Sequence, residues 1–470
     1  MRTASQLKNR KEANSVDYSA ANTGLWNFFI HMGILAAALL VSNVLLRKST
    51  LIRKTLMPTA VLAGFLLLAI RSLGILNLPD AFLEMVTYHG IAIGFIALSL
   101  RSTGEGDKSQ GKGFQSGALI ISTYMMQAVA GLLISLALSY TVMPGLFKAS
   151  GILLPMGYGQ GAGQANNVGS TYEALGFAGG QSFGLSLAAA GYLCACVVGV
   201  IYLNIRSRRG LKTGRDVELL SGSITVDTFE DKGEAPLSES VDRLSIQVAL
   251  VFITYLLTYL VTLGLTKAIG AASENLGSLL SPLLWGFNFI TGSMLALLIR
   301  VIMKALRKSK VMTRQYQNNY LLSRISGLAF DLMIVSGISS INFSELTGLW
   351  VPFLLMAVTG GVTTFYYLRW LCKVVYPGYA EEAFVSMYGM LTGTISSGVI
   401  LLRQLDPSFK TPAANNLITG SSFGIVLGAP LLILIGLAAK SEAMLLLTLG
   451  LAAAYMVVLI FVMYKGSKRK

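Results

Sequence analysis

The sequence predicts an all-α polytopic membrane protein. We expect two inverted-topology repeats of five transmembrane helices, each with a re-entrant hairpin, plus one extra C-terminal helix. Three observations support this. The 470-residue chain is 54% hydrophobic and only 13% charged, whereas soluble domains average about 25% charged residues. Its apolar residues gather in runs long enough to cross a bilayer, and short motifs recur in the same order in both halves.

The apolar runs define the predicted spans, because about 20 apolar residues cross a hydrocarbon core of roughly 30 Å. Eleven runs qualify: 25–46, 56–75, 82–100, 116–143, 179–205, 244–268, 281–304, 320–343, 346–371, 416–438 and 441–464. The predicted segments are a polar N-terminal tail (1–24), a first membrane repeat (25–206), a cytoplasmic linker (207–243), a second repeat (244–440), and an extra transmembrane helix with a basic tail (441–470).

The basic residues predict the orientation of the chain. The loops after alternate spans, together with the C-terminal tail, hold 29 of the 37 Lys and Arg residues, and the opposite loops hold four. The positive-inside rule then places the C-terminus in the cytoplasm and the N-terminus outside a bacterial cytoplasmic (inner) membrane. The N-terminal tail, which carries the remaining four, runs against this rule. The rule accounts for the net charge of +15 without a nucleic-acid partner.

Matching motifs in the two halves predict the repeats. Ser182-Phe-Gly-Leu recurs as Ser422-Phe-Gly-Ile, 240 residues later, and Ile91-Ala-Ile-Gly resembles Ile334-Val-Ser-Gly, 243 residues later. Because each repeat has five spans, the second half enters the membrane from the opposite side. Mirrored halves can expose one central site to either face in turn, so the sequence favours alternating-access transport.

Two further stretches, 150–172 and 383–403, are too polar for ordinary spans. The first is dense in glycines and amides between residues 156 and 171, and the second in Gly, Ser and Thr. Unpaired polar groups in hydrocarbon cost several kcal/mol each, so such backbone must be buried in protein or line a cavity. We expect a re-entrant hairpin at each stretch. The alternative is that their small residues form a helix-packing face.

The tips of such hairpins have a specific chemistry. Helix N-termini offer N–H groups and a positive dipole end to carboxylates, while hydroxyl and carbonyl oxygens suit Na⁺. The candidate substrate-binding residues are Gln160, Gly161, Gly163, Gln164, Asn166, Asn167, Thr394, Ser396 and Ser397. The candidate ion-binding residues are Asp331, Ser182, Ser422 and Thr392.

Asp331 stands near the middle of the span 320–343. A carboxylate there costs roughly 2.5–3.5 kcal/mol on insertion scales, so it should face the protein interior. It can serve as a cation ligand, as a protonation site, or as a hydrogen-bond partner of a neighbouring span. No cofactor is predicted besides Na⁺ as coupling ion, since Cys194-Ala-Cys196 lacks metal-ligand spacing.

At the first hairpin the chain resembles the bacterial sodium/glutamate symporter family. That family carries a Gly-His-Gly-Thr-Gly-Ala motif followed by a Phe-Gly-Leu span; here the stretches read Gly159-Gln-Gly-Ala-Gly-Gln164 and Phe183-Gly-Leu185. Residues 58–64, Pro-Thr-Ala-Val-Leu-Ala-Gly, resemble the family's early Pro-x-Pro-Val-Ala-Gly-Gly. The resemblance covers roughly residues 25–440. Two departures fall on the hairpin tips: Gln160 replaces the family's His, and residues 388–393 lack its Gly-His-Cys-Gly-Phe-Gly character.

The resemblance implies Na⁺-driven uptake of L-glutamate, or of a related anionic amino acid or carboxylate, held with the ion between the hairpin tips. It also implies an elevator-like mechanism and a homodimer in the bilayer. A passive channel and an H⁺-coupled transporter of another small organic anion stay open as alternatives. An enzyme is not expected, because the membrane spans hold one central aspartate and the chain carries no zinc or nucleotide motif.

Overall fold

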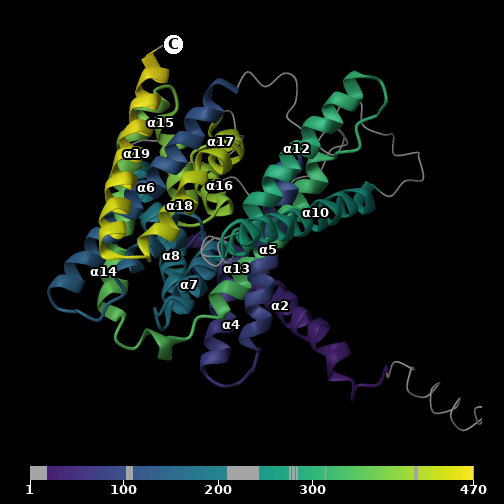
Figure 1. Cartoon of the computed structure of the whole chain (residues 1–470), viewed down its shortest axis with the longest axis horizontal. Helices are drawn as coiled ribbons and strands as arrows, with labels where there is room; N and C mark the ends of the chain where they lie inside the picture. Colours follow the sequence, from purple (N-terminus) through teal and green to yellow (C-terminus); the bar gives the residue numbers. More distant parts are fainter. Residues whose placement is uncertain are drawn as a thin grey trace, which may run out of the picture.

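The computed structural model describes residues 18–101, 110–208, 243–274, 277, 281, 284–312, 314–406 and 411–468, and within these ranges the chain is helical without a β-strand. The long helices pack in two groups, visible side by side in Figure 1. The first group contains α2 (Thr23–Lys48), α4 (Thr59–Ser72), α5 (Asp80–Leu100), α10 (Arg243–Ala272), α12 (Asn288–Lys308) and α13 (Asn319–Ser339). The second contains α6 (Gln110–Tyr140), α8 (Gly180–Arg208), α14 (Trp350–Val375), α17 (Ala413–Leu427), α18 (Ala429–Ala438) and α19 (Glu442–Lys468).

Short elements connect the long helices. They are α3 (Thr50–Lys54), the 3₁₀ turn η1 (Lys148–Ile152), the π-helical turn η2 (Pro155–Gly159), α7 (Ala162–Ala174), the 3₁₀ turn η3 (Phe343–Leu346), α15 (Ala380–Thr392) and α16 (Ile395–Arg403). The two stretches predicted to be hairpins therefore each contain a short helix that begins after a backbone break. The predicted N-terminal tail and the linker 207–243 lie almost wholly outside the described residues.

Nine helices among the described residues are long and apolar enough to cross a membrane, and a tenth span is possible if α17 and α18 count as one. These two helices meet at a 54° bend, so the run predicted at 416–438 is a broken one. The span predicted at 56–75 is too long: α4 has 14 residues, about 21 Å at 1.5 Å per residue. The span predicted at 281–304 is shifted, because α12 begins at Asn288.

The first group is built on the antiparallel pair α5 and α13, which touch through small residues. A Cβ at Gly90 would lie 3.0 Å from Ala329 O, and Ser326 Oγ donates a hydrogen bond of 2.9 Å to Gly94 O. In lipid the hydrophobic effect does not favour helix association, because lipid tails are themselves apolar. Small residues that let two helices approach closely stabilise the pair through van der Waals contacts instead.

The helices pack reciprocally between the two halves of the chain. In the first group α4 packs on α13 and α12 packs on α5, each pair joining the two halves. Within each half, α2 packs on α4, and α10 packs on α12. In the second group α6 packs on α17 and α14 packs on α8. Helices from the two halves of the chain therefore contact each other in both groups.

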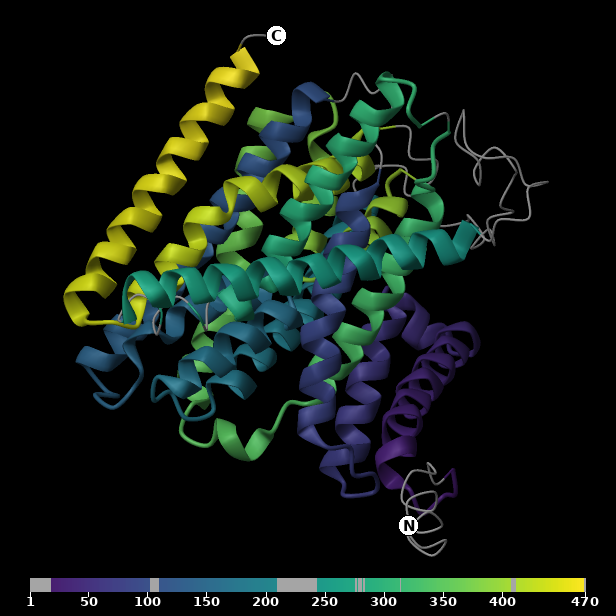
Figure 2. The same ribbon diagram turned by 45° about the vertical axis from the view of Figure 1, so that its right-hand side comes forward.

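Basic residues gather at one end of the molecule. There Arg300 Nη1 donates to Arg101 O at 3.1 Å, and Lys112 Nζ donates to Val375 O at 3.4 Å. α19 ends at this side and α2 begins at the opposite one (Figure 2). At the opposite end Lys148 pairs with Glu442 at 2.5 Å, an exposed contact.

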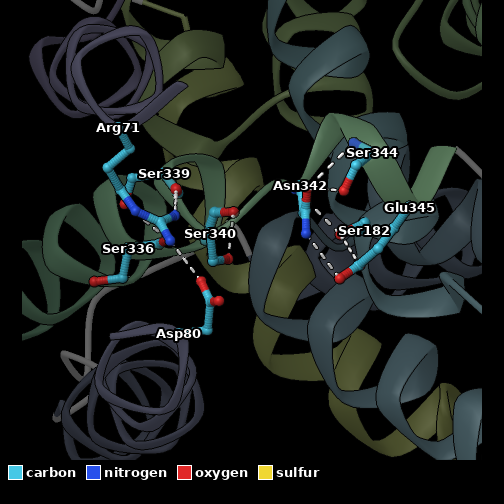
Figure 3. A network of polar contacts seen from close by, with 10 residues as sticks. Arg71, Asp80, Ser182, Ser336, Ser339, Ser340, Asn342, Ser344 and Glu345 are labelled. Carbon is cyan, nitrogen blue, oxygen red and sulfur yellow. Dashed lines mark hydrogen bonds and ion pairs between the residues drawn. The ribbon is translucent and has the colours of Figure 1, made fainter. Parts of the chain in front are cut away.

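At that same end a polar network ties α13 to its neighbours (Figure 3). Arg71 of α4 donates one hydrogen bond to Ser339 O, at the C-terminus of α13, and another to Asp80 Oδ1 at 2.6 Å. A cation at this position satisfies a carbonyl that the helix leaves free and complements its dipole. Arg71 is only 17% exposed, whereas Asp80 is 61% exposed.

Because of this difference, we expect Arg71→Met to destabilise the protein by about 1–3 kcal/mol, the range for a lost hydrogen bond from a charged group to a partly buried acceptor. Asp80→Asn should cost at most about 1 kcal/mol, since exposed ion pairs contribute little. Thermal unfolding of the purified variants in detergent measures both. Equal shifts for the two variants would contradict the role assigned to Arg71 in capping α13.

Candidate functional site

The first backbone break precedes α7 and depends on glycines. Gly161 has φ +83°, a conformation that residues with a Cβ rarely adopt. A Cβ at Gly157 would lie 2.7 Å from Ala188 N of α8, and one at Gly159 would lie 2.8 Å from Gln127 Oε1 of α6. The chain is thus irregular where it is enclosed by protein, as backbone at membrane depth requires.

The second break separates α15 from α16 at Gly393 and Thr394. The Thr394 side chain caps α16 by accepting a hydrogen bond of 3.1 Å from Ser397 N. The two short helices fold back on each other, because a Cβ at Gly389 would lie 2.8 Å from Gly398 Cα. Residues 380–403 therefore form a tight helical hairpin.

The two breaks meet against Tyr192 of α8. Tyr192 Oη accepts a hydrogen bond of 2.9 Å from Ala162 N, the first residue of α7. A Cβ at Gly161 would lie 3.0 Å from the same oxygen and 3.9 Å from Gly393 O. The N-termini of α7 and α16 consequently face one locus, and each contributes backbone N–H groups without helical partners and a positive dipole end.

A cavity of about 110 Å³ lies at this locus. The first group of helices contributes one wall, with Ile91 and Phe95 of α5 and Phe330, Met333 and Ile334 of α13. The remaining lining residues come from the two breaks and the second group: Tyr124, Gly159, Gln160, Gly161, Gln164, Tyr192, Met390, Gly393, Thr394, Ile395, Ser396 and Ser421. The cavity therefore lies at the boundary between the two groups.

Gln164, on the first turn of α7, is the most informative residue of the cavity. The residue is 1% exposed, yet neither its amide nitrogen nor its amide oxygen has a hydrogen-bond partner among the residues that the structure describes. A buried amide left unpaired costs roughly 1–3 kcal/mol, and native proteins pair nearly all such groups. An unpaired amide beside two helix N-termini is the arrangement expected of a ligand site.

Gln127 of α6 positions the second hairpin beside this cavity. Its Nε2 donates to Leu391 O at 3.0 Å, in the last turn of α15, and to Thr364 Oγ1 of α14 at 2.9 Å. Gln127 is fully buried. One side chain of α6 thus contacts both α14 and α15 next to the break at Gly393.

Five of the nine residues predicted to bind substrate line the cavity: Gln160, Gly161, Gln164, Thr394 and Ser396. The other four contact or hydrogen-bond other parts of the protein. A Cβ at Gly163 would lie 2.6 Å from Ile91 Cδ1, so this glycine serves close packing. Asn166 accepts from Gln181 Nε2 at 2.8 Å, Asn167 donates to Gly286 O at 2.6 Å, and Ser397 caps α16 with Thr394.

The four predicted ion-binding residues do not line this cavity. Ser182 Oγ donates to Glu345 Oε2 at 2.7 Å and accepts from Asn342 N (Figure 3). Thr392 Oγ1 donates to Tyr388 O within its own helix at 2.7 Å.

The other two ion-binding candidates lie beside cavity residues on their helices. Ser422 is half-buried next to Ser421, which lines the cavity. Asp331 is half-buried one turn from Ile334, and it forms no hydrogen bond or ion pair with the part of the chain that the structure describes.

Several lining residues were not predicted from the sequence, among them Tyr124, Tyr192, Met390 and Ser421. For Ser421 a signal was present, because Ser421, Gly424, Ile425 and Gly428 recur at i, i+3, i+4 and i+7 and share one helix face. For the tyrosines the sequence carries no such signal.

No protein-family model matches this chain, and no curated protein matches it significantly.

Proposed function

We propose that this protein is a secondary active transporter that carries a small carboxylate together with Na⁺ across the bacterial cytoplasmic membrane. The substrate class is a carboxylate, and glutamate and related anionic amino acids are among the carboxylates to be tested. The buried amide of Gln164, unpaired among the described residues, carries this proposal, because it lines a partly open cavity beside the N-termini of α7 and α16. Hydrogen-bond donors and the positive dipole ends of two helices at one locus favour a carboxylate ligand.

The reciprocal packing of the helices supports two inverted repeats with re-entrant hairpins. α5 and α13 are the third spans of the two predicted repeats and pack on each other antiparallel. If the first five spans correspond to the second five in order, the contact of α4 with α13 corresponds to the contact of α12 with α5. Discontinuous helices at the interface of such repeats are where transporters hold substrate and coupling ion.

The position of the cavity supports alternating access of the elevator type. One wall belongs to α5 and α13, and the others belong to the hairpins and the second group of helices. Sliding of the second group against the first would carry the hairpin tips from one membrane face to the other. The first group would stay fixed as the scaffold and as the interface of a homodimer.

Coupling to Na⁺ is part of the proposal and draws on hydroxyl and carbonyl oxygens near the hairpin tips. Ser396 and Thr394 line the cavity, and Asp331, the predicted carboxylate ligand, lies on α13 one turn from the lining residue Ile334. An H⁺-coupled mechanism would instead use protonation of Asp331. The end that gathers Arg101, Lys112 and Arg300 is assigned to the cytoplasm by the positive-inside rule.

The test is uptake of labelled carboxylates, L-glutamate included, into proteoliposomes. We expect accumulation above equilibrium with an inward Na⁺ gradient and none when choline replaces Na⁺. Asp331→Asn should weaken the dependence on Na⁺, while Gly450→Val, at an exposed glycine of α19 with no neighbouring atoms, should not. Equilibration without accumulation would show a passive channel, and accumulation driven by a pH gradient alone would show H⁺ coupling.

A further inference from the structure

Among the described residues that line the cavity between the hairpin tips, none has a charged side chain. Its described lining consists of apolar residues, glycines, and neutral amides and hydroxyls. Much of this polar capacity is already used: Tyr192 Oη accepts from Ala162 N, and Ser421 Oγ donates to Leu417 O at 2.7 Å. Gln160 Nε2 donates to Met156 Sδ at 3.6 Å. In the described lining, the amide of Gln164, the hydroxyls of Tyr124 and Ser396, and the two helix N-termini remain for a ligand.

Such a lining suits one carboxylate and no further charge. Glutamate has two carboxylates and an ammonium group, and an isolated buried charge is strongly unfavourable unless it is paired. The helix N-termini can stabilise one anion. The lining offers no carboxylate for the ammonium group and no Lys or Arg for the second anion.

A second, more apolar cavity adjoins the first. It measures about 70 Å³ and shares Phe95, Tyr124, Gln160 and Ser421 with the first cavity, so the two adjoin. Its other walls are largely Ile, Leu and Phe: Ile120, Ile121, Phe287, Phe289, Ile290, Ile425, Leu431 and Leu432. An apolar cavity of about 150 Å³ holds benzene, so the two together accommodate a carboxylate with a branched or cyclic tail.

We infer that the substrate is a monocarboxylate with an apolar tail, its carboxylate at Gln164 and the helix N-termini and its tail between α6, α12 and α17. This inference rests on the proposed transport function and names the substrate class of the same site. Each methylene buried in the second cavity should tighten binding about fourfold. Tail length and shape are therefore what the site selects.

Gly424 of α17 sets the room for the tail. A Cβ at this position would lie 3.8 Å from Ile120 Cγ2 and 3.9 Å from Ile121 Cδ1, which is ordinary contact. A methyl group therefore fits without strain, and a larger side chain enters the tail cavity. Gly424→Ala and Gly424→Val form a graded pair that narrows the cavity while a helical residue stays in place.

The experiment is calorimetric titration of the purified protein in detergent with NaCl. The ligands are 4-methylpentanoate, acetate, L-glutamate and the uncharged 4-methylpentan-1-ol. We expect 4-methylpentanoate to bind roughly 100–300-fold more tightly than acetate, because its four extra carbons are buried. Glutamate and the alcohol should bind too weakly to measure, the first for its unpaired charges and the second for its missing carboxylate.

The variants test the position of the tail. Gly424→Val should reduce the preference for 4-methylpentanoate over acetate by about tenfold or more, Gly424→Ala by less, and the matched control Gly450→Val not at all. Tighter binding of glutamate than of 4-methylpentanoate would overturn the inference while leaving carboxylate transport in place. Binding of none of the carboxylates, with no Na⁺-driven uptake of any, would overturn both.

Discussion

Gln164→Met is expected to abolish carboxylate uptake and to raise the thermal stability of the protein at the same time. The substitution keeps an unbranched side chain of similar length and removes both polar atoms of an amide that has no partner in the ligand-free protein. Relief of that unpaired amide should stabilise the fold by about 1–3 kcal/mol. Loss of the same amide should weaken carboxylate binding by an order of magnitude or more, since hydrogen bonds to charged groups are the strong ones.

Gln247→Met is the matched control for this prediction. Gln247 of α10 is equally buried, but its amide is used: Nε2 donates to Tyr316 O at 2.8 Å and Oε1 accepts from Asn318 N at 3.2 Å. The same substitution there should lower stability, because it removes hydrogen bonds between segments. Uptake in proteoliposomes and unfolding in detergent measure both variants. A loss of stability in Gln164→Met would show that the amide is structural and would remove the main support for the site.

Gly131→Val is expected to prevent accumulation of folded protein. Gly131 of α6 contacts Gly151 of η1 backbone to backbone, and a Cβ at either position would overlap the other residue's main chain. Overpacked cores typically lose 1–3 kcal/mol when side chains can give way, and here only backbone could move. We therefore expect a loss of about 3 kcal/mol or more, comparable to much of the stability of a typical domain.

The control is Gly33→Val in α2, a helical glycine whose Cβ position is open. Both variants carry the same change in helix propensity, so the difference between them reports only the contact of α6 with η1. The measurement is the yield of monodisperse protein after extraction and the unfolding temperature of whatever is recovered. Equal behaviour of the two variants would mean that η1 does not depend on α6 for its position.

The long spans could be predicted from the sequence because their apolar runs are local. α5, α8 and α13 begin and end within a few residues of the predicted ranges 82–100, 179–205 and 320–343. The weaker predictions involve proline and glycine. α4 starts only after Pro58, and α17 stops at Gly428, where the chain bends.

The candidate site was predictable in part for the same reason. The density of glycines and amides pointed to the stretch that contains Gln164, and the hydroxyls pointed to Thr394, because such residues cannot face lipid. Which of these polar residues faces the cavity depends on its position around the helix axis and on the helices packed against it. Asn167 was predicted on the same grounds as Gln164, yet its amide is bound to Gly286 O, a partner far away in the chain.

The sequence by itself determined that the chain is a bundle of membrane-length helices with two polar interruptions, because hydropathy and the hydrogen-bonding requirement of backbone in lipid act over a few residues at a time. Only the tertiary structure decided that the interruptions meet at Tyr192, that Gln164 is left without a partner, and that the lining carries no charge. These properties depend on contacts between helices far apart in the chain, and no local pattern encodes which side chains such contacts satisfy.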